Sequence, residues 1–195
     1  QGDVTILDFG QNFAGVVELR IRGKAGQTIT VRHAEVLEGD RLYTASLRTA
    51  KAEILYICKE GAQTYLPRLT YMGFRYIAVT GIAPEALEVK ARVLSSDFEE
   101  SGNFSCSNVL LNRLQSNIRW SALSNFVDIP TDCPQRDERQ GWTGDIAVFA
   151  STACYNFNLS RFYEKWLKDM RLEQSRGGGI PTVVPIQGCS TPVVA

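Results

Sequence analysis

Residues 127–145 concentrate acidic, basic and aromatic side chains in a segment whose backbone is restricted by proline and glycine. Pro130 and Pro134 exclude a regular helix through its first part, and Gly141 and Gly144 permit a tight path before the next apolar stretch. A loop of this kind can direct several carboxylates into one small volume. Glycoside hydrolysis needs such an arrangement, because one carboxylic acid protonates the departing oxygen while a second carboxylate activates water or attacks the sugar.

The other polar and aromatic residues of this segment also suit a sugar. Trp142 offers an apolar face for the C–H side of a pyranose ring. Arg136 and Arg139 can donate to sugar hydroxyls or keep neighbouring carboxylates ionised. The residue types therefore point to a glycosidic bond as the substrate.

Each of these residues also has a structural interpretation. Asp145 directly precedes an apolar helical stretch and can be its N-cap, and Trp142 can be a core aromatic residue. Glu138 by itself is typical of a solvated loop acid, and Asp137 with Arg139 is typical of a surface ion pair. The residue types alone leave these alternatives open.

The first part of the chain alternates apolar and polar residues with the period of two that is typical of β-strands. Glycines punctuate the sequence between these runs. The strands that we expect lie at 17–22, 28–32, 54–58, 75–80 and 87–94. Several short strands separated by turns predict an antiparallel β-sandwich or a barrel-like β-domain.

The second part of the chain has the apolar period of helices. Leu110, Leu114 and Ile118 lie on one face of a first helix, which Ser105 or Ser107 can cap. Two further helices are expected at 146–157 and 159–174. The former lacks a clear polar side, which predicts burial in a larger helical body. The latter repeats large apolar residues, Phe162, Trp166 and Met170, every fourth position.

The polar stretch 95–103 separates the two parts, so we expect a β-sandwich domain at 1–97 and a helical domain at 98–195. The chain begins in strand-like sequence and ends in a loop-like stretch, and three helices with such apolar faces do not complete a domain. We therefore expect a piece of a longer protein in which the helical domain continues. Taken alone, the apolar helical faces would allow the chain to associate with itself.

The composition is that of an ordinary globular protein, with 44% hydrophobic and 22% charged residues. Lys+Arg and Asp+Glu number 21 each, so no net charge favours nucleic acid or an anionic membrane. No apolar run approaches the roughly 20 residues of a membrane span. We expect neither nucleic acid nor membrane as a partner.

The cysteines and the single histidine do not have the spacing of a metal site. The cysteines are Cys58, Cys106, Cys133, Cys154 and Cys189. We expect mostly buried free thiols, a structural role for His33, no metal and no other cofactor.

Residues 132–145, Asp-Cys-Pro-Gln-Arg-Asp-Glu-Arg-Gln-Gly-Trp-Thr-Gly-Asp, resemble the signature of bacterial α-L-rhamnosidases, which are inverting glycosidases with an (α/α)6 barrel. Segments 8–12, 33–37 and 70–76 are similar to the concanavalin-like β-sandwich domain that precedes this barrel, and 180–185 is similar to the barrel itself. The resemblance covers nearly the whole chain in family order. It implies an α+β fold, an antiparallel β-sandwich followed by the first helices of the barrel.

By this resemblance Glu138 is the general acid, and Asp132, Arg136, Trp142 and Asp145 line the rhamnose pocket. The general base of the family is a glutamate farther along the barrel, which no position of this chain matches. An inverting pair of carboxyl groups is separated by roughly 6.5–9.5 Å, and only one side of that gap is present. The resemblance implies that the parent protein hydrolyses terminal α-L-rhamnosyl linkages of a glycoside or oligosaccharide, and that the isolated chain is inactive.

Two other classes of function are compatible with the sequence. The β-strands resemble lectin-like sandwiches in architecture, so a carbohydrate-binding module without catalysis is the main alternative, and a purely structural module is another. The strands display no cluster of exposed aromatic residues suited to a sugar platform. Release of rhamnose by a longer chain, abolished by Glu138→Gln, would distinguish the enzyme from both.

Overall fold

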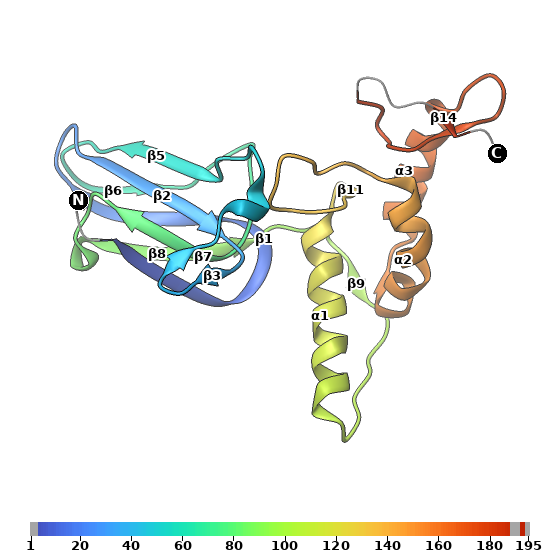
Figure 1. The fold of residues 1–195 in the computed structure, drawn as a ribbon, viewed down its shortest axis with the longest axis horizontal. Helices are drawn as coiled ribbons and strands as arrows, with labels where there is room; N and C mark the ends of the chain where they lie inside the picture. Colours follow the sequence, from blue (N-terminus) through green and yellow to red (C-terminus); the bar gives the residue numbers. More distant parts are fainter. Residues whose placement is uncertain (1–3, 188–191, 194–195) are drawn as a thin grey trace. The chain divides into compact units, whose positions relative to one another are not determined.

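The computed structural model describes residues 4–187 and 192–193, which form two compact units. The first unit contains Gln1–Leu94 together with Pro134–Asp137, and the second contains Ser95–Cys133 and Glu138–Ala195. Antiparallel strands build the first unit, and three helices carry the second (Figure 1). The predicted α+β fold is therefore confirmed.

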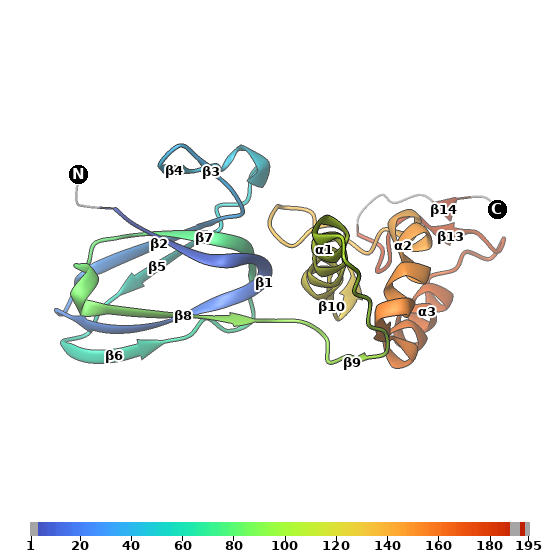
Figure 2. The same cartoon turned by 90° about the horizontal axis from the view of Figure 1, so that it is seen from below.

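A six-stranded antiparallel sheet forms the first unit, in the order β5-β2-β7-β1-β6 with β8 also paired to β1. Its strands are β1 (Thr5–Gly23), β2 (Thr28–Ala34), β5 (Glu53–Ile57), β6 (Gly61–Tyr65), β7 (Met72–Thr80) and β8 (Leu87–Val93). The first part of β1 pairs with β7 and the second part pairs with β8 and β6. Because β1 bends between these parts, β2 and β7 lie in one layer while β6 and β8 lie in the other (Figure 2).

Short elements complete the first unit, and one of its main strands was not predicted. The short elements are the hairpin of β3 (Leu37–Glu38) and β4 (Arg41–Leu42) and two 3-10 turns at Ala45–Leu47 and Pro84–Ala86. Gly61 was expected only to mark a turn, but it begins β6. Its φ of 86° gives the turn, and the chain then continues directly into the strand.

The apolar residues that face the inside of the sandwich are fully buried. They include Val17, Leu19, Ile29, Val31, Phe74, Ile77 and Val79, none more than 1% exposed. Burial of each such large side chain contributes about 1.5–3 kcal/mol to folding. The period-two pattern therefore predicted these core positions of β1 and β2, whereas Phe74 of β7 lies before the strand expected at 75–80.

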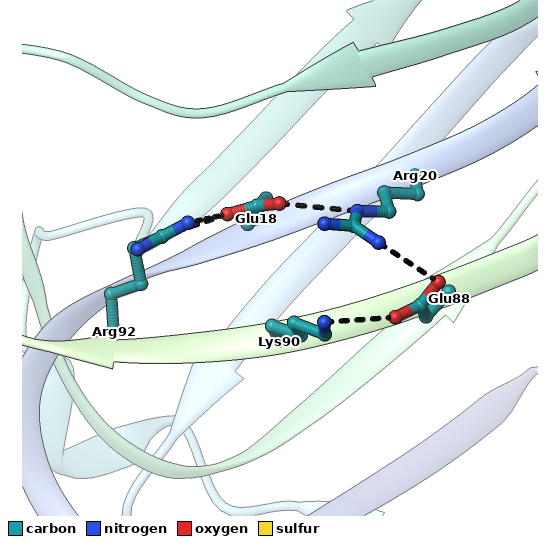
Figure 3. A network of polar contacts seen from close by, with 5 residues as sticks. All are labelled: Glu18, Arg20, Glu88, Lys90 and Arg92. Carbon is teal, nitrogen blue, oxygen red and sulfur yellow. Dashed lines mark hydrogen bonds and ion pairs between the residues drawn. The ribbon is translucent and has the colours of Figure 1, made fainter.

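Glu18 alternates with the apolar residues of β1, so the period of two would place it on a solvent-exposed face. Only 6% of its side chain is exposed. Arg92 on β8 donates to Glu18 through Nε at 2.7 Å, and Arg20 donates to its other oxygen at 3.3 Å (Figure 3). Arg20 and Lys90 also pair with Glu88 at 3.6 and 3.3 Å. The hydrogen bond from Arg92 holds the pKa of Glu18 below its ordinary value, so the charge stays paired between the neighbouring strands.

The segment Pro134–Asp137 packs within the first unit at two points. The side chain of Asp137 accepts hydrogen bonds from the backbone N–H of Thr49, at 3.3 Å, and from the Thr49 hydroxyl. Gly73 on β7 lies so close to Pro134 and Gln135 that a Cβ atom at this position would be 2.8 Å from their backbone. The contacts of Thr49 and Gly73 with this segment are called the loop anchor below.

The second unit contains α1 (Val109–Asn125), α2 (Thr143–Asn156) and α3 (Ser160–Leu172). The expected caps of two helices were wrong. Asn108, and neither Ser105 nor Ser107, caps α1 by accepting from Leu110 and Leu111 backbone N–H groups at 2.9 and 3.3 Å.

Asp145 does not cap α2, because the helix begins two residues before it. The N-cap position is Trp142, which makes no side-chain capping bond. Asp145 instead lies in the first turn, where the positive end of the helix dipole favours its carboxylate.

Aromatic residues form the core of the second unit. Phe126 stacks on Phe162 at a centroid distance of 4.9 Å, and Phe98 meets Phe162 edge-on at 5.4 Å. Phe162 and Trp166 are 8% and 3% exposed, and Met170 packs against them, as the spacing predicted. Three pairs of two-residue strands lie in the segments outside the helices. These are β9 (Glu99–Glu100) with β12 (Phe157–Asn158), β10 (Phe126–Val127) with β11 (Ile129–Pro130), and β13 (Ile180–Pro181) with β14 (Pro192–Val193).

Several large apolar side chains of the helices remain exposed. Leu110 and Leu114, predicted to share one face of α1, are 79% and 53% exposed, and Val148 on α2 is 85% exposed. Among the residues that the structure describes, no helix combines the length and apolarity needed to cross a bilayer.

The cysteines with a described position are free thiols, but only half of them are buried. Cys58 and Cys133 are buried, while Cys106 and Cys154 are exposed, so the expectation of mostly buried thiols was too broad. Cys189 lies outside the described residues.

His33 is buried with an exposed fraction of 1%, and its Nδ1 donates to the carbonyl oxygen of Ala52 at 2.9 Å. Its Nε2 has no hydrogen-bond partner among the described residues, and the ring meets Phe74 edge-on. Burial lowers the pKa of His33 from 6.5 to about 4, because the charged imidazolium would lose its water. The histidine is structural, as predicted, and it is neutral at pH 7.

We expect His33 to make the first unit sensitive to acid. Well above pH 6.5 His33 is unprotonated in both the folded and the unfolded chain. As the pH falls from 6.5 to about 4 the unfolded chain binds the proton more readily, so stability decreases, by roughly 3 kcal/mol for a shift of this size. Urea unfolding at a series of pH values should show this loss, and His33→Gln, which keeps a donor for Ala52, should reduce it. Because His33 is the only histidine, a single imidazole NMR signal that titrates near pH 6.5 would contradict the prediction.

We expect Gly73→Ala to displace the loop anchor. The added Cβ would meet backbone atoms that cannot rotate away, so the free energy of unfolding should fall by about 1–3 kcal/mol. Limited proteolysis should cut Pro134–Asp137 faster in this variant. Gly177→Ala is the matched control, because its nearest neighbour, the Ser175 hydroxyl, would be 3.9 Å away. Equal proteolysis of the two variants would show that the close approach at Gly73 does not hold the loop.

Candidate active site

The loop that carries the predicted acid is closed by two hydrogen bonds between its ends. The backbone N–H of Asp132 donates to the carbonyl oxygen of Gln140 at 3.1 Å, and the backbone N–H of Gln140 donates to Oδ1 of Asp132 at 2.9 Å. Arg139 has a φ of 52°, the left-handed region that a residue with a side chain rarely adopts. This turn reverses the chain next to Glu138. The closure therefore returns Glu138 to the neighbourhood of Asp132.

Glu138 is half-buried beside two other polar side chains of the loop. One carboxylate oxygen each of Asp132 and Glu138, and Sγ of Cys133, all lie within 4.8 Å of one another. The indole Nε1 of Trp142 donates to Oε1 of Glu138 at 3.1 Å. The structure thus brings together three of the predicted site residues, Asp132, Glu138 and Trp142.

Asp145 joins this group through the pockets of the second unit. Asp132 and Asp145 both line a pocket of about 400 Å³, whose apolar wall includes Phe126, Ile146 and Phe149. Asp145 also lines a second pocket of about 530 Å³ with Trp142 and a mainly apolar wall. Asp145 is exposed at the first turn of α2, so its carboxylate is available to a ligand.

A later segment of the chain fixes the start of α2. The backbone N–H of Thr143 donates to the carbonyl oxygen of Thr182 at 2.9 Å, and that of Val184 donates to the carbonyl oxygen of Gly141 at 2.9 Å. A Cβ atom on Gly141 would collide with the carbonyl oxygen of Val184. Glycine at 141 therefore allows the two segments to approach, and their pairing holds Trp142 in place.

Arg136 is the one predicted site residue that the second unit does not contain. It belongs to Pro134–Asp137, the segment held by the loop anchor in the first unit. Its predicted role in binding the sugar stays a prediction.

Sequence reasoning missed several residues that position the site. Thr49 holds Asp137, 88 residues away in the chain, and no local pattern signals such a contact. Gln140 acts through its backbone, which leaves no signature in its side chain. The glycine before Trp142 is the only signal that another segment approaches closely there.

Asp132, Cys133 and Glu138 are also a set of side chains that could each offer one atom to a metal ion. The spacing of the histidine and the cysteines in the sequence gives no signal of this grouping. Oδ1 of Asp132 already accepts from Gln140, and Oε1 of Glu138 already accepts from Trp142. One oxygen of each carboxylate is therefore already engaged within the loop.

Glu138 lies next to Asp132 and Trp142, each of which lines one of the two pockets. A half-buried carboxyl group in such a place can protonate the oxygen of a bound glycoside, and the role of Glu138 as the acid stays a prediction. Asp132 and Asp145 can accept hydrogen bonds from ring hydroxyls, and Trp142 gives an apolar wall.

Comparison with known proteins agrees with this chemistry. Residues 1–95 match the family model of the bacterial alpha-L-rhamnosidase concanavalin-like domain, and residues 99–194 match that of the bacterial alpha-L-rhamnosidase 6 hairpin glycosidase domain. An alpha-L-rhamnosidase of Streptomyces avermitilis is 47% identical over 95% of this chain and 18% of its own length. One of Formosa agariphila is 44% identical over 95% of this chain and 21% of its own length.

Solved structures give the same result. The S. avermitilis alpha-L-rhamnosidase complexed with L-rhamnose has a TM-score of 0.90 at 46% identity, covering 95% of this chain and 18% of that protein. A rhamnosidase of Aspergillus terreus has a TM-score of 0.88 at 46% identity, covering 92% of this chain and 22% of that protein. The chain thus spans about a fifth of the length of the relatives that it matches. By its sequence and by its fold, this chain belongs to the bacterial α-L-rhamnosidase family.

Proposed function

We propose that this chain supplies the proton-donating side of the active site of an α-L-rhamnosidase, which hydrolyses terminal α-L-rhamnosyl linkages with inversion. Glu138 protonates the glycosidic oxygen, while Asp132, Arg136, Trp142 and Asp145 bind the rhamnosyl unit. The observation that carries the proposal is the approach of Glu138 to Asp132 within 4.8 Å, with Trp142 bonded to the same carboxyl group. The L-rhamnose bound by the S. avermitilis relative supports the choice of sugar.

Asp132 is too close to Glu138 to be the base of an inverting pair. Such a pair leaves roughly 6.5–9.5 Å between its carboxyl groups for the attacking water. Oδ1 of Asp132 also accepts from the Gln140 backbone, which fixes the carboxylate as part of the loop. The family resemblance implies that the base is a glutamate farther along the barrel, which no position of this chain matches. The isolated chain then does not turn over substrate.

The domain division that we propose for the family member follows the change of period in the sequence. The β-sandwich takes residues 1–97, and the start of the (α/α)6 barrel takes residues 98–195. The break between the compact units at Leu94 and Ser95 and the limits of the two family models support this division.

Glu138→Gln in the whole protein should abolish most of the release of rhamnose from an aryl α-L-rhamnoside. Loss of a general acid costs roughly 10²–10⁴-fold in kcat, because the departing oxygen must leave without a proton. Initial rates and an NMR assay of the first anomer released, expected with inverted configuration, check both parts of the proposal. The matched control is Glu164→Gln on the exposed side of α3. If Glu138→Gln turned over substrate at the rate of this control, Glu138 would not be the acid. If the whole protein bound rhamnose without any turnover, it would be a carbohydrate-binding module instead.

We also propose that the isolated 195-residue chain associates with itself through its uncovered helical faces. The exposed apolar residues of the three helices include Val109, Leu110, Leu114, Val148, Tyr155, Leu167 and Leu172. Large exposed apolar areas are rare on monomers, so these side chains favour association. Association covers them and releases their water.

Sedimentation velocity should show an average mass that rises with the concentration of the 195-residue chain. The double variant Leu110→Glu, Leu114→Glu should shift the distribution toward the monomer, because association would then bury two charges. Leu69→Glu in the first unit is the control, since Leu69 is exposed but lies outside the helices. A wild-type chain that stays monomeric at every concentration would refute the association.

A further inference from the structure

Trp142 makes a hydrogen bond that its role as an apolar wall for the sugar does not require. Its indole Nε1 donates to Oε1 of Glu138 at 3.1 Å, and both side chains are half-buried. The two residues flank the left-handed turn at Arg139 and precede α2. The bond therefore depends on the loop conformation and is no by-product of helical spacing.

The backbone around Trp142 is fixed on both sides, so the indole is a rigid donor. The N–H of Trp142 donates to the carbonyl oxygen of Gln140 at 3.0 Å, and Trp142 forms an antiparallel bridge with Val183. Thr143 and Gly141 pair with Thr182 and Val184 as described above. A donor held in this way can select one orientation of the Glu138 carboxyl group.

We infer that Trp142 is a positioning residue that keeps the acidic proton of Glu138 on Oε2 and directs it at the glycosidic oxygen. This inference rests on the proposed function. An indole N–H only donates, so it requires a lone pair on its partner oxygen. In the protonated carboxyl group the carbonyl oxygen can accept this bond most readily, which makes Oε1 the carbonyl oxygen and leaves the proton on Oε2.

The hydrogen bond from Trp142 stabilises the Glu138 carboxyl group more strongly as the reaction proceeds. The Oε2–H bond breaks and a new O–H bond forms on the departing oxygen, which also takes the electron pair of the breaking C–O bond. Water adds its hydroxyl to the anomeric carbon and gives its other proton to the second carboxylate. Glu138 becomes negatively charged, and hydrogen bonds to a charged acceptor are stronger than those to a neutral one. Trp142 therefore stabilises the transition state more than the bound substrate, which is the condition for a faster reaction.

The test is the dependence of kcat on the leaving group in Trp142→Phe of the whole protein. Phenylalanine keeps an aromatic wall but has no N–H. A dinitrophenolate group leaves without a proton, whereas phenolate needs the acid. We expect kcat for the phenyl α-L-rhamnoside to fall roughly tenfold more than kcat for the dinitrophenyl α-L-rhamnoside, a part of the effect of a complete general acid.

Trp166→Phe is the matched control, because its indole donates to a core carbonyl oxygen, that of Val184, at 3.4 Å. It should lower the rates with both substrates by the same factor. An equal fall for both substrates in Trp142→Phe, or the same leaving-group dependence in Trp166→Phe, would overturn the inference. If Trp142→Phe does not fold, benzothienylalanine at position 142 keeps the shape of the ring without the N–H and should give the same ratio.

The outcome for the wild type separates this inference from the proposed function. A whole protein that releases no rhamnose from either substrate would refute the proposed function, and this inference would fall with it. An active wild type whose Trp142→Phe variant shows an unchanged ratio of the two rates would refute only the positioning role.

Discussion

The pair of hydrogen bonds between Asp132 and Gln140 is the constraint on which the candidate site depends. One bond joins backbone to backbone and the other joins the Gln140 backbone to the Asp132 carboxylate, so the ends of the loop are held at fixed separation. The left-handed backbone at Arg139, with a φ of 52°, then turns the chain back toward α2. That path directs Glu138 toward Asp132 and Trp142. Without the closure, the same residues would be ordinary loop acids separated by solvent.

Two supports outside the loop stabilise this path. The segment Ile180–Pro181 and the residues after it pair with the start of α2, where Gly141 permits the close approach. The loop anchor holds Pro134–Asp137 within the first unit. A carboxyl group that must transfer a proton needs its position fixed by surrounding contacts, and a loop without supports would not provide them. The first unit thus holds Pro134–Asp137, although it carries none of the proposed acids.

Both units leave large apolar side chains in contact with solvent. The sandwich encloses its core between two layers, but Leu55 and Ile57 on β5 are 63% and 64% exposed. The helices of the second unit share one aromatic core around Phe126, Phe162 and Trp166, while apolar residues on their other faces remain in contact with solvent. The chain matches one concanavalin-like and one helical domain model of the family, and it spans about a fifth of the length of its relatives.

The sequence alone determined the α+β fold, the positions of the main helices, the core face of α3 and the family, because these follow from periodicity and from local motifs. It did not predict β6, the capping of α1 by Asn108 or the place of Asp145 inside the first turn of α2, since a helix start depends on which of several nearby polar residues meets the free N–H groups. The burial of Glu18 and the bond from Thr49 to Asp137 were also decided by tertiary structure, because their partners are distant in the chain. The same holds for the carboxyl group of Glu138: the motif singled it out as the proposed acid, but only the folded loop showed that Trp142 donates to one of its oxygens.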